Sequence, residues 1–175
     1  MKRAVFLDRD GVINKTLVVN GIPFPPRRLQ DLEILNGVVE SIAMLKAAEL
    51  EIIVITNQPD VARGITSQEF VETIHFELEA KLGVSNFYTC FHDNSDHCDC
   101  RKPKSGLLRW AAQELEIDLS SSFLVGDRWR DIGAGQSVGC SCYFVDYTYS
   151  EPPPLKPFIR VSSLLEATRD IIGKI

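Results

Sequence analysis

Two carboxylates near the amino terminus, Asp8 and Asp10, have the spacing that phosphoryl transfer requires. They lie in the segment Phe-Leu-Asp-Arg-Asp-Gly, where Gly11 permits a backbone conformation that other residues avoid. If Asp8 attacks phosphorus in line, Asp10 can protonate the leaving alkoxide and then activate water for hydrolysis. An ordinary turn rich in Asp and Gly has the same composition, so this pair alone does not decide the chemistry.

Two other segments could bind phosphate. The run Thr56-Asn57-Gln58 supplies a hydroxyl and an amide that can donate hydrogen bonds to phosphate oxygens, although an Asx-type turn has the same sequence. The run Arg101-Lys102-Pro103-Lys104 places three cations within four residues of an otherwise acidic chain. Such a group could neutralise a transferring phosphoryl group, whereas solvated surface charge is its ordinary explanation.

A further pair of carboxylates occurs in the segment from Gly126 to Asp131. Mg²⁺ prefers a few carboxylates together with water and phosphate oxygens, and Asp8 and Asp127 suit that role. Asp131 is either a neighbour that supports the ligands or a helix-start residue that complements the helix dipole.

Cys90, His92, Cys98 and Cys100 form a pattern that indicates a structural Zn²⁺ site. Three thiolates and one imidazole complete a tetrahedral shell and leave no open position. His97 is a competing ligand, and unrelated loop cysteines are the alternative interpretation. The remaining pair, Cys140 and Cys142, stands in apolar surroundings and is typical of buried, inert thiols.

The elements that must position these residues follow from hydrophobic periodicity. Short β-branched runs alternate with amphipathic segments, as in parallel βαβ units. Strands are predicted at Arg3–Leu7, Ile52–Ile55, Phe87–Cys90, Phe123–Val125, Cys142–Val145 and Phe158–Val161. Helices are predicted at Val38–Glu49, Ser67–Leu82, Leu107–Leu115, Ile132–Val138 and Ser163–Ile172, the second of them with a capping box from Thr66 to Glu69. The fold class is therefore α/β, a doubly wound, mostly parallel sheet, whose ligands bind beyond the carboxyl ends of the strands.

Composition limits the classes of partner. The 175 residues suit a single domain, 1–175, with the zinc loop at about 90–100. A net charge of −5 argues against nucleic acid and anionic membranes, and favours a small-molecule phosphorylated substrate. The chain has neither an evident signal peptide nor an apolar stretch of membrane-spanning length. Its odd, clustered cysteines predict a cytoplasmic protein, and we expect a monomer.

Taken together, the four polar clusters resemble the four motifs of the haloacid dehalogenase superfamily over nearly the whole chain. The resemblance implies a capless Rossmann-like fold and a phosphoaspartate mechanism, with Asp8 as nucleophile and Asp10 as acid/base. It also implies that Thr56 and Lys102 steady the phosphoryl group. Mg²⁺ would be held by Asp8, the Asp10 carbonyl and Asp127.

The zinc loop directly before Arg101-Lys102-Pro103 is similar to that of the heptose bisphosphate and histidinol-phosphate phosphatases. By that resemblance the reaction is hydrolysis of the C7 phosphate of D-glycero-D-manno-heptose 1,7-bisphosphate, a step toward cell-surface polysaccharide. Substrate contacts would come from Asn57, Arg101 and Arg128, with Thr16 to Val19 at the entrance.

Departures at Pro59-Asp60 and Lys104-Ser105, together with a short zinc loop, leave histidinol phosphate or another small ester open. A zinc-stabilised binding module without activity and a phosphoryl-transferring mutase are the rival hypotheses. All the catalytic residue types are present, which disfavours the first. The absence of an evident cap segment disfavours the second.

Overall fold

A six-stranded, entirely parallel sheet forms the centre of the molecule. The structure is a computed structural model that describes residues 1–175. The strand order is β5-β4-β1-β6-β7-β8. Their bounds are β1 Ala4–Leu7, β4 Glu51–Asn57, β5 Asn86–Cys90, β6 Phe123–Gly126, β7 Ser141–Val145 and β8 Ile159–Val161. Because β1 lies between β4 and β6, the carboxyl ends of these three strands meet at one edge of the sheet.

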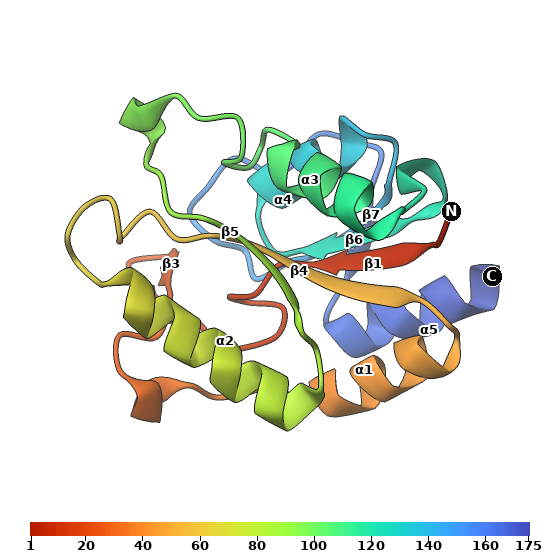
Figure 1. Cartoon of the computed structure of the whole chain (residues 1–175), viewed down its shortest axis with the longest axis horizontal. Coiled ribbons are helices and arrows are strands. Elements are labelled where there is room, and N and C mark those ends of the chain that lie inside the picture. Colours follow the sequence, from red (N-terminus) through yellow and green to blue (C-terminus); the bar gives the residue numbers. More distant parts are fainter.

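Five helices cover the two faces of this sheet in two layers (Figure 1). One layer contains α1 (Val38–Ala47), α2 (Gln68–Leu82) and α5 (Leu164–Lys174), and the other contains α3 (Gly106–Leu115) and α4 (Trp129–Gln136). This is the doubly wound α/β arrangement predicted from the alternation of strand and helix patterns.

The central strand shows why its sequence is a continuous apolar run. In β1 every residue is buried, with Val5 and Leu7 packed into the cluster beneath α1, α2 and α5. Ala4 and Phe6 point to the opposite cluster beneath α3 and α4. Side chains alternate across a strand, so a strand covered on both faces must be apolar at every position. Asp8, the next residue, is therefore the first polar group past this core.

Each predicted strand and helix is present, with strand ends that differ by no more than two residues. Two helix starts were predicted incorrectly. Helix α4 begins at Trp129, three residues before the predicted start, because the Asp131 carboxylate accepts a hydrogen bond from the Arg128 backbone N–H at 3.0 Å. Helix α2 is capped by Ser67 and not by Thr66, since the Ser67 hydroxyl accepts from Phe70 N at 3.1 Å.

A β-hairpin that the sequence patterns above do not include lies between β1 and α1. Strands β2 (Leu17–Val19) and β3 (Ile22–Phe24) pair in antiparallel register around Asn20-Gly21. Both turn residues have positive φ, 52° and 76°, as a two-residue hairpin turn requires. Asn-Gly between apolar runs is a strong hairpin signal. Between β1 and α1 the chain contains this hairpin and one short 3₁₀ turn, Leu29–Asp31.

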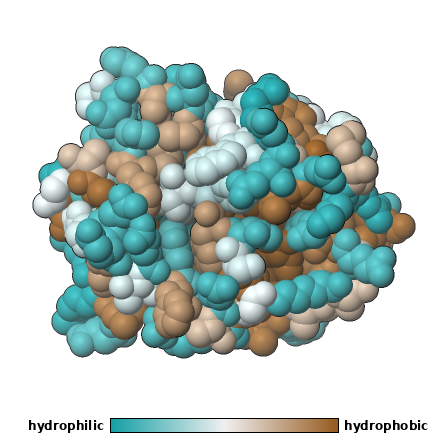
Figure 2. Space-filling model, viewed as in Figure 1, coloured by the Kyte–Doolittle hydropathy of each residue, from teal (hydrophilic) through white to brown (hydrophobic).

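The loop after β5 protrudes from the body of the molecule (Figure 1) and carries the predicted zinc ligands His92, Cys98 and Cys100, while Cys90 ends β5. It includes a short 3₁₀ turn, Asn94–Asp96, and hydrophilic residues cover it in the space-filling view (Figure 2). Among the helices, none has the length and apolar character needed to cross a membrane.

The cap of α2 can be tested with a matched pair of variants. We expect Ser67→Ala to lower the free energy of unfolding by about 1 kcal/mol, because it removes the acceptor for the Phe70 backbone N–H, which has no partner within the helix. Thr66→Ala should leave that free energy unchanged, since the Thr66 hydroxyl makes no hydrogen bond here. Urea unfolding measures both, and an equal loss in the two variants would contradict the assignment of Ser67 as the cap.

Candidate active site

A polar cavity of about 200 Å³ opens where the carboxyl ends of β1, β4 and β6 meet. Asp8 follows β1, Asn57 ends β4 and Asp127 follows β6. The lining consists of Asp8, Asp10, Thr16, Ile22, Pro23, Phe24, Pro25, Asn57, Pro59, Asp60, Arg63, Arg101, Lys102, Asp127, Arg128, Arg130 and Asp131. The structure thus brings residues from all four predicted clusters together with part of the unpredicted hairpin.

The Lys102 ammonium lies at the base of this cavity, and only 2% of the Lys102 side chain is exposed. It is 2.6 Å from Asp8 Oδ1 and 2.6 Å from Asp131 Oδ1, and it donates to the Ile55 carbonyl at 2.8 Å. Burial lowers its pKa, but the carboxylates of Asp131 and Asp8 outweigh burial and leave the pKa raised. Lys102 therefore stays charged next to the proposed nucleophile.

Asn57 holds the Lys102 backbone in place. Its side-chain Nδ2 donates to the Lys102 carbonyl and its Oδ1 accepts from the Lys102 N–H, both at 3.1 Å. This two-point contact joins β4 to the loop before α3. Asn57 lines the cavity as predicted, but its amide is already occupied by the backbone of the loop that carries Lys102.

Three carboxylates, those of Asp8, Asp127 and Asp131, have oxygens within 4.8 Å of one another, and all three residues are buried. Burial raises the pKa of Asp8 to about 7, and Asp131 and Asp10 add to the rise while Lys102 opposes it. The pKa of Asp127 is also raised well above its usual value, by burial and then by Asp8 and Asp131. The cluster has more negative charge than Lys102 alone can balance.

Asp127 fits the role of a metal ligand. Neither of its buried carboxylate oxygens accepts a hydrogen bond of ordinary geometry. Burial raises its pKa by more than Tyr149 and Arg128 lower it, so this carboxylate is costly unless a cation binds it. Gly11 makes the approach possible, because a Cβ atom there would stand 2.0 Å from Asp127 Oδ2. Asp131, in contrast, already binds Lys102 and the Arg128 N–H. Asp8 and Asp127 therefore suit Mg²⁺ better than Asp131 does.

The Asp10 carboxylate is held by neighbours on several sides. Arg9 donates to it through Nε and Nη2 at 2.9 to 3.3 Å. Asn14 Nδ2 donates to Oδ1 at 3.0 Å and Gln58 Nε2 to Oδ2 at 2.8 Å. The proposed acid/base group therefore has a defined orientation at the cavity wall.

The other sequence-predicted residues lie around this centre or outside it. Thr56 is buried behind the cavity wall, where its hydroxyl accepts from Gln58 Nε2 at 2.8 Å. Thr16 lines the cavity, and its hydroxyl is 3.3 Å from that of Tyr149. Val19 is 46% exposed on β2 and does not line the cavity. Of the predicted entrance, Thr16 to Val19, only Thr16 lines the cavity. Residues of β3 line the entrance in place of the others.

Four arginines, Arg63, Arg101, Arg128 and Arg130, surround the mouth of the cavity. Arg63 binds the Asp93 carboxylate, Arg101 binds Asn94 Oδ1 at 2.8 Å, and Arg128 is paired with Glu151. Arg130 has no hydrogen-bond or ion-pair partner and lies over the Trp129 ring, 4.9 Å from its centroid. Burial and then repulsion from Arg128 and Arg101 lower its pKa. Arg130 is thus the one arginine of this mouth without an anionic partner.

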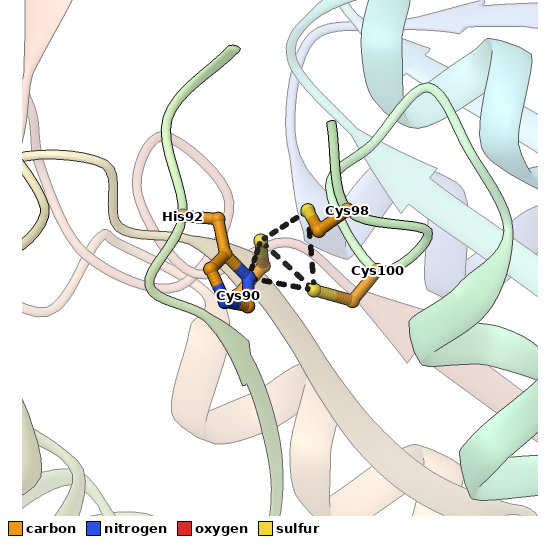
Figure 3. A group of neighbouring side chains, drawn as sticks. All are labelled: Cys90, His92, Cys98 and Cys100. Atoms are coloured by element: carbon orange, nitrogen blue, oxygen red, sulfur yellow. Dashed lines mark hydrogen bonds between the residues drawn. The ribbon is translucent and has the colours of Figure 1, made fainter. Parts of the chain in front are cut away.

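Cys90, at the end of β5, and the loop residues His92, Cys98 and Cys100 converge on one point (Figure 3). Their sulfur and Nδ1 atoms lie within 4.8 Å of one another, and Cys90 Sγ is 3.2 Å from Cys100 Sγ. His97 is not part of the group, which decides between the two candidate histidines. None of the cysteines forms a disulfide. Four donors at this separation fit tetrahedral Zn²⁺.

Several neighbours of the site stand in or near the sequence motifs, but the sequence patterns assign them no role of their own. Arg9, Asn14 and Gln58 hold Asp10, and Arg63 and Arg130 add to the cationic mouth. The only local signal for Arg9 and Gln58 is their position beside predicted site residues. Cys140 and Cys142 are buried away from this cavity, where burial raises the pKa of each thiol to about 12, as expected for inert groups.

The chain is similar to several known proteins. A family model described as HAD-hydrolase-like matches residues 99–166. The D-glycero-beta-D-manno-heptose-1,7-bisphosphate 7-phosphatase of Pasteurella multocida is 34% identical, covering 79% of this chain and 78% of that protein. The D-glycero-alpha-D-manno-heptose-1,7-bisphosphate 7-phosphatase of Photorhabdus laumondii is 31% identical and covers 95% of both.

A solved structure is similar over the full length of both chains. It is the crystal structure of D,D-heptose 1.7-bisphosphate phosphatase from B. bronchiseptica complexed with magnesium and phosphate, with a TM-score of 0.85, 27% identity and 100% coverage of each chain.

The excess of buried carboxylates predicts a pH-dependent stability in protein without added Mg²⁺. Raised pKa values mean that folding favours the protonated forms, so stability should fall as the pH rises from the ordinary carboxyl value through about 7. Asp127→Asn removes one such charge. We expect it to raise the free energy of unfolding at pH 7.5 by about 1 kcal/mol or more, and to flatten the pH dependence.

Asp131→Asn is the contrasting variant, because it takes a carboxylate from the buried Lys102 ammonium. It should lower the free energy of unfolding by about 3 kcal/mol. Urea unfolding between pH 5 and 8 measures both variants. A loss of stability in Asp127→Asn equal to that in Asp131→Asn would contradict the assignment of Asp127 as an unpaired charge.

Proposed function

Because this chain belongs to the haloacid dehalogenase-like phosphatases, as a relative 34% identical to it establishes, we propose that it hydrolyses the C7 phosphate of D-glycero-D-manno-heptose 1,7-bisphosphate. One geometric feature supports this function above all others. An acidic centre, Asp8 with Asp127, lies at the base of a cavity whose mouth is lined by arginines. A bisphosphate has one phosphate for each of these regions.

In the proposed reaction the Asp8 carboxylate attacks phosphorus and displaces the sugar alkoxide. Asp10 gives a proton to the leaving oxygen as the P–O bond breaks, and a phosphoaspartate forms on Asp8. Asp10 then takes a proton from the water that attacks the phosphoaspartate, which releases phosphate and restores both carboxyl groups. Lys102, 2.6 Å from Asp8, neutralises charge on the phosphoryl oxygens. Thr56, the other residue predicted to steady the phosphoryl group, lies outside the cavity lining and holds Gln58, so it would act on the phosphoryl group only through that neighbour.

Mg²⁺ is the cofactor that the carboxylates of Asp8 and Asp127 and the Asp10 carbonyl would hold. When bound, it supplies positive charge that lets an anionic carboxylate approach an anionic phosphate. The unpartnered oxygens of Asp127 support this assignment from within the chain.

The arginine-lined mouth supports a substrate with a second anionic group. Arg101 and Arg128 were predicted as substrate contacts, and both line the cavity with their guanidinium groups already oriented by Asn94 and Glu151. Arg130, which has no such partner, adds a free guanidinium at the same mouth. Bidentate contacts from arginine to phosphate are geometrically favourable. Histidinol phosphate has only one phosphate and would leave this charge unused.

Zn²⁺ bound by Cys90, His92, Cys98 and Cys100 would have a structural role in this scheme. Cys100 directly precedes Arg101 and Lys102, so the metal would order the loop that brings both cations to the cavity. The backbone at Asp99 also packs against Gly106, where a Cβ atom would stand 2.3 Å from the Asp99 carbonyl. The loop is thereby connected to the start of α3.

The experiment that tests this function compares three substrates at saturating Mg²⁺. We expect kcat/KM for heptose 1,7-bisphosphate to exceed that for heptose 7-phosphate and for histidinol phosphate by about tenfold or more, because only the bisphosphate has a second phosphate for the arginines. Both anomers of the bisphosphate should be assayed by phosphate release. Asp8→Asn should lower kcat by on the order of 10³ or more while the circular dichroism spectrum is retained.

Two results would reject parts of this scheme. Activity that survives Asp8→Asn would remove Asp8 as nucleophile. A clear preference for histidinol phosphate over the bisphosphate would replace heptose as the substrate and leave the chemistry of the centre unchanged.

Metal content tests the zinc site with a matched pair. Reduced protein prepared without chelator should contain about one Zn²⁺ per chain, because three thiolates and one imidazole fill a tetrahedral shell. Cys98→Ser should lose this metal and lower activity. His97→Ala, a neighbour outside the group, should keep both. Mass spectrometry of the metals measures the content, and wild-type protein without zinc would refute the site.

A further inference from the structure

Arg9 is an unusual residue to find at the centre of an acidic protein. Its side chain is fully buried, and it is the largest fully buried side chain of the chain. Its only carboxylate partner is Asp10, the next residue, which it contacts through Nε at 3.3 Å and through Nη2 at 2.9 and 3.0 Å. A buried guanidinium needs acceptors for its remaining N–H groups, so its other partners matter.

His75 on α2 accepts the next of these hydrogen bonds. Its Nε2 lies 3.2 Å from Arg9 Nη1. Arginine can only donate, so Nε2 must be the unprotonated nitrogen and Nδ1 must hold the ring proton. Burial and then the Arg9 cation lower the pKa of His75 to about 3, so the ring is neutral. A charged ring here would face Arg9 with like charge.

The His75 ring is itself fixed in place. It stacks on Phe87 of β5 with centroids 4.6 Å apart and planes inclined by 14°. Helix α2 and strand β5 thus fix the position of the His75 ring. The ring accepts a hydrogen bond from Nη1 of Arg9, and Nε and Nη2 of Arg9 bind the Asp10 carboxylate. The sequence patterns assign His75 no function, and the chemistry of Asp8 and Lys102 does not use it.

We propose that His75 and Arg9 are positioning residues, which hold the Asp10 carboxyl group where it can exchange a proton with the leaving oxygen. This inference rests on the proposed acid/base role of Asp10. Asn14 and Gln58 also bind Asp10, but both are neutral amides. Arg9 alone makes a charged, two-nitrogen contact, which resists rotation of the carboxyl group.

The alternative is that the contacts between His75, Arg9 and Asp10 only stabilise the fold. Substrates with different leaving groups distinguish this structural role from the positioning role. p-Nitrophenolate leaves as a stable anion and needs no proton from Asp10, whereas a sugar or histidinol alkoxide does. A misplaced Asp10 should therefore impair kcat/KM for the alkyl ester and spare that for p-nitrophenyl phosphate. Loss of folded protein or distortion of the Asp8 centre would impair both equally.

The experiment compares His75→Leu, His75→Gln and Leu78→Val on these two kinds of ester. The alkyl ester is heptose 1,7-bisphosphate, or histidinol phosphate if that is the better substrate. His75→Leu should lower kcat/KM for the alkyl ester by about tenfold or more and that for p-nitrophenyl phosphate by less than about twofold. His75→Gln keeps an acceptor for Arg9 and should restore most of the loss. Leu78→Val, a core change on the same helix, should leave the ratio of the two esters unchanged.

Asp10→Asn serves as the reference for the test. It should show the same leaving-group dependence in a stronger form. If it impairs both esters equally, the acid/base role of Asp10 fails. If it shows the dependence and His75→Leu does not, Asp10 keeps its role and the positioning by His75 is refuted. Arg9→Lys keeps the charge and loses the two-nitrogen contact, so it should also impair the alkyl ester more than p-nitrophenyl phosphate. It replaces His75→Leu in the test if that variant does not fold, and equal effects on both esters would then refute the positioning.

Discussion

The ammonium of Lys102 lies between the carboxylates of Asp8 and Asp131, 2.6 Å from each, and the remainder of the site is organised around it. A buried cation is stable only with such partners, and these carboxylates would repel each other without it. Lys102 belongs to a loop, so its position requires support from elsewhere. Asn57 supplies that support from β4 through two backbone hydrogen bonds.

One ammonium does not balance three carboxylates, and the unpaired charges of the site lie at two different residues. Asp127, with both oxygens unpartnered, is where negative charge exceeds what the chain itself neutralises. Arg130, without an acid of its own, is where positive charge exceeds it. A site that leaves both charges unpaired sacrifices stability, and such local departures from the usual rules are typical of functional positions. Magnesium at the first and a phosphate at the second would remove both costs.

Much of this arrangement could be predicted from the strand pattern alone. Asp8 and Asp127 follow uninterrupted apolar runs, and parallel strands direct their carboxyl ends to one edge of a sheet. The hairpin at Asn20-Gly21 was missed although its turn signal is present, because its strands are three residues each, β2 is exposed at every position and β3 buries only Pro23. The early start of α4 depends on Asp131, whose side chain caps the helix while it also binds Lys102.

The sequence by itself determined the order of strands and helices, the identity of the polar residues at the strand ends and the cluster of cysteines and histidines after β5, because these follow from local periodicity and spacing. It left His92 and His97 as alternatives, and the structure chose His92. Only the tertiary structure decided which groups are paired. Arg9 and His75 are separated by 66 positions. Their contact arises because α2, whose His75 stacks on Phe87 of β5, packs over the sheet face near the end of β1, with β4 between β1 and β5. Local sequence contains no signal for such a pairing, since it depends on the docking of distant elements.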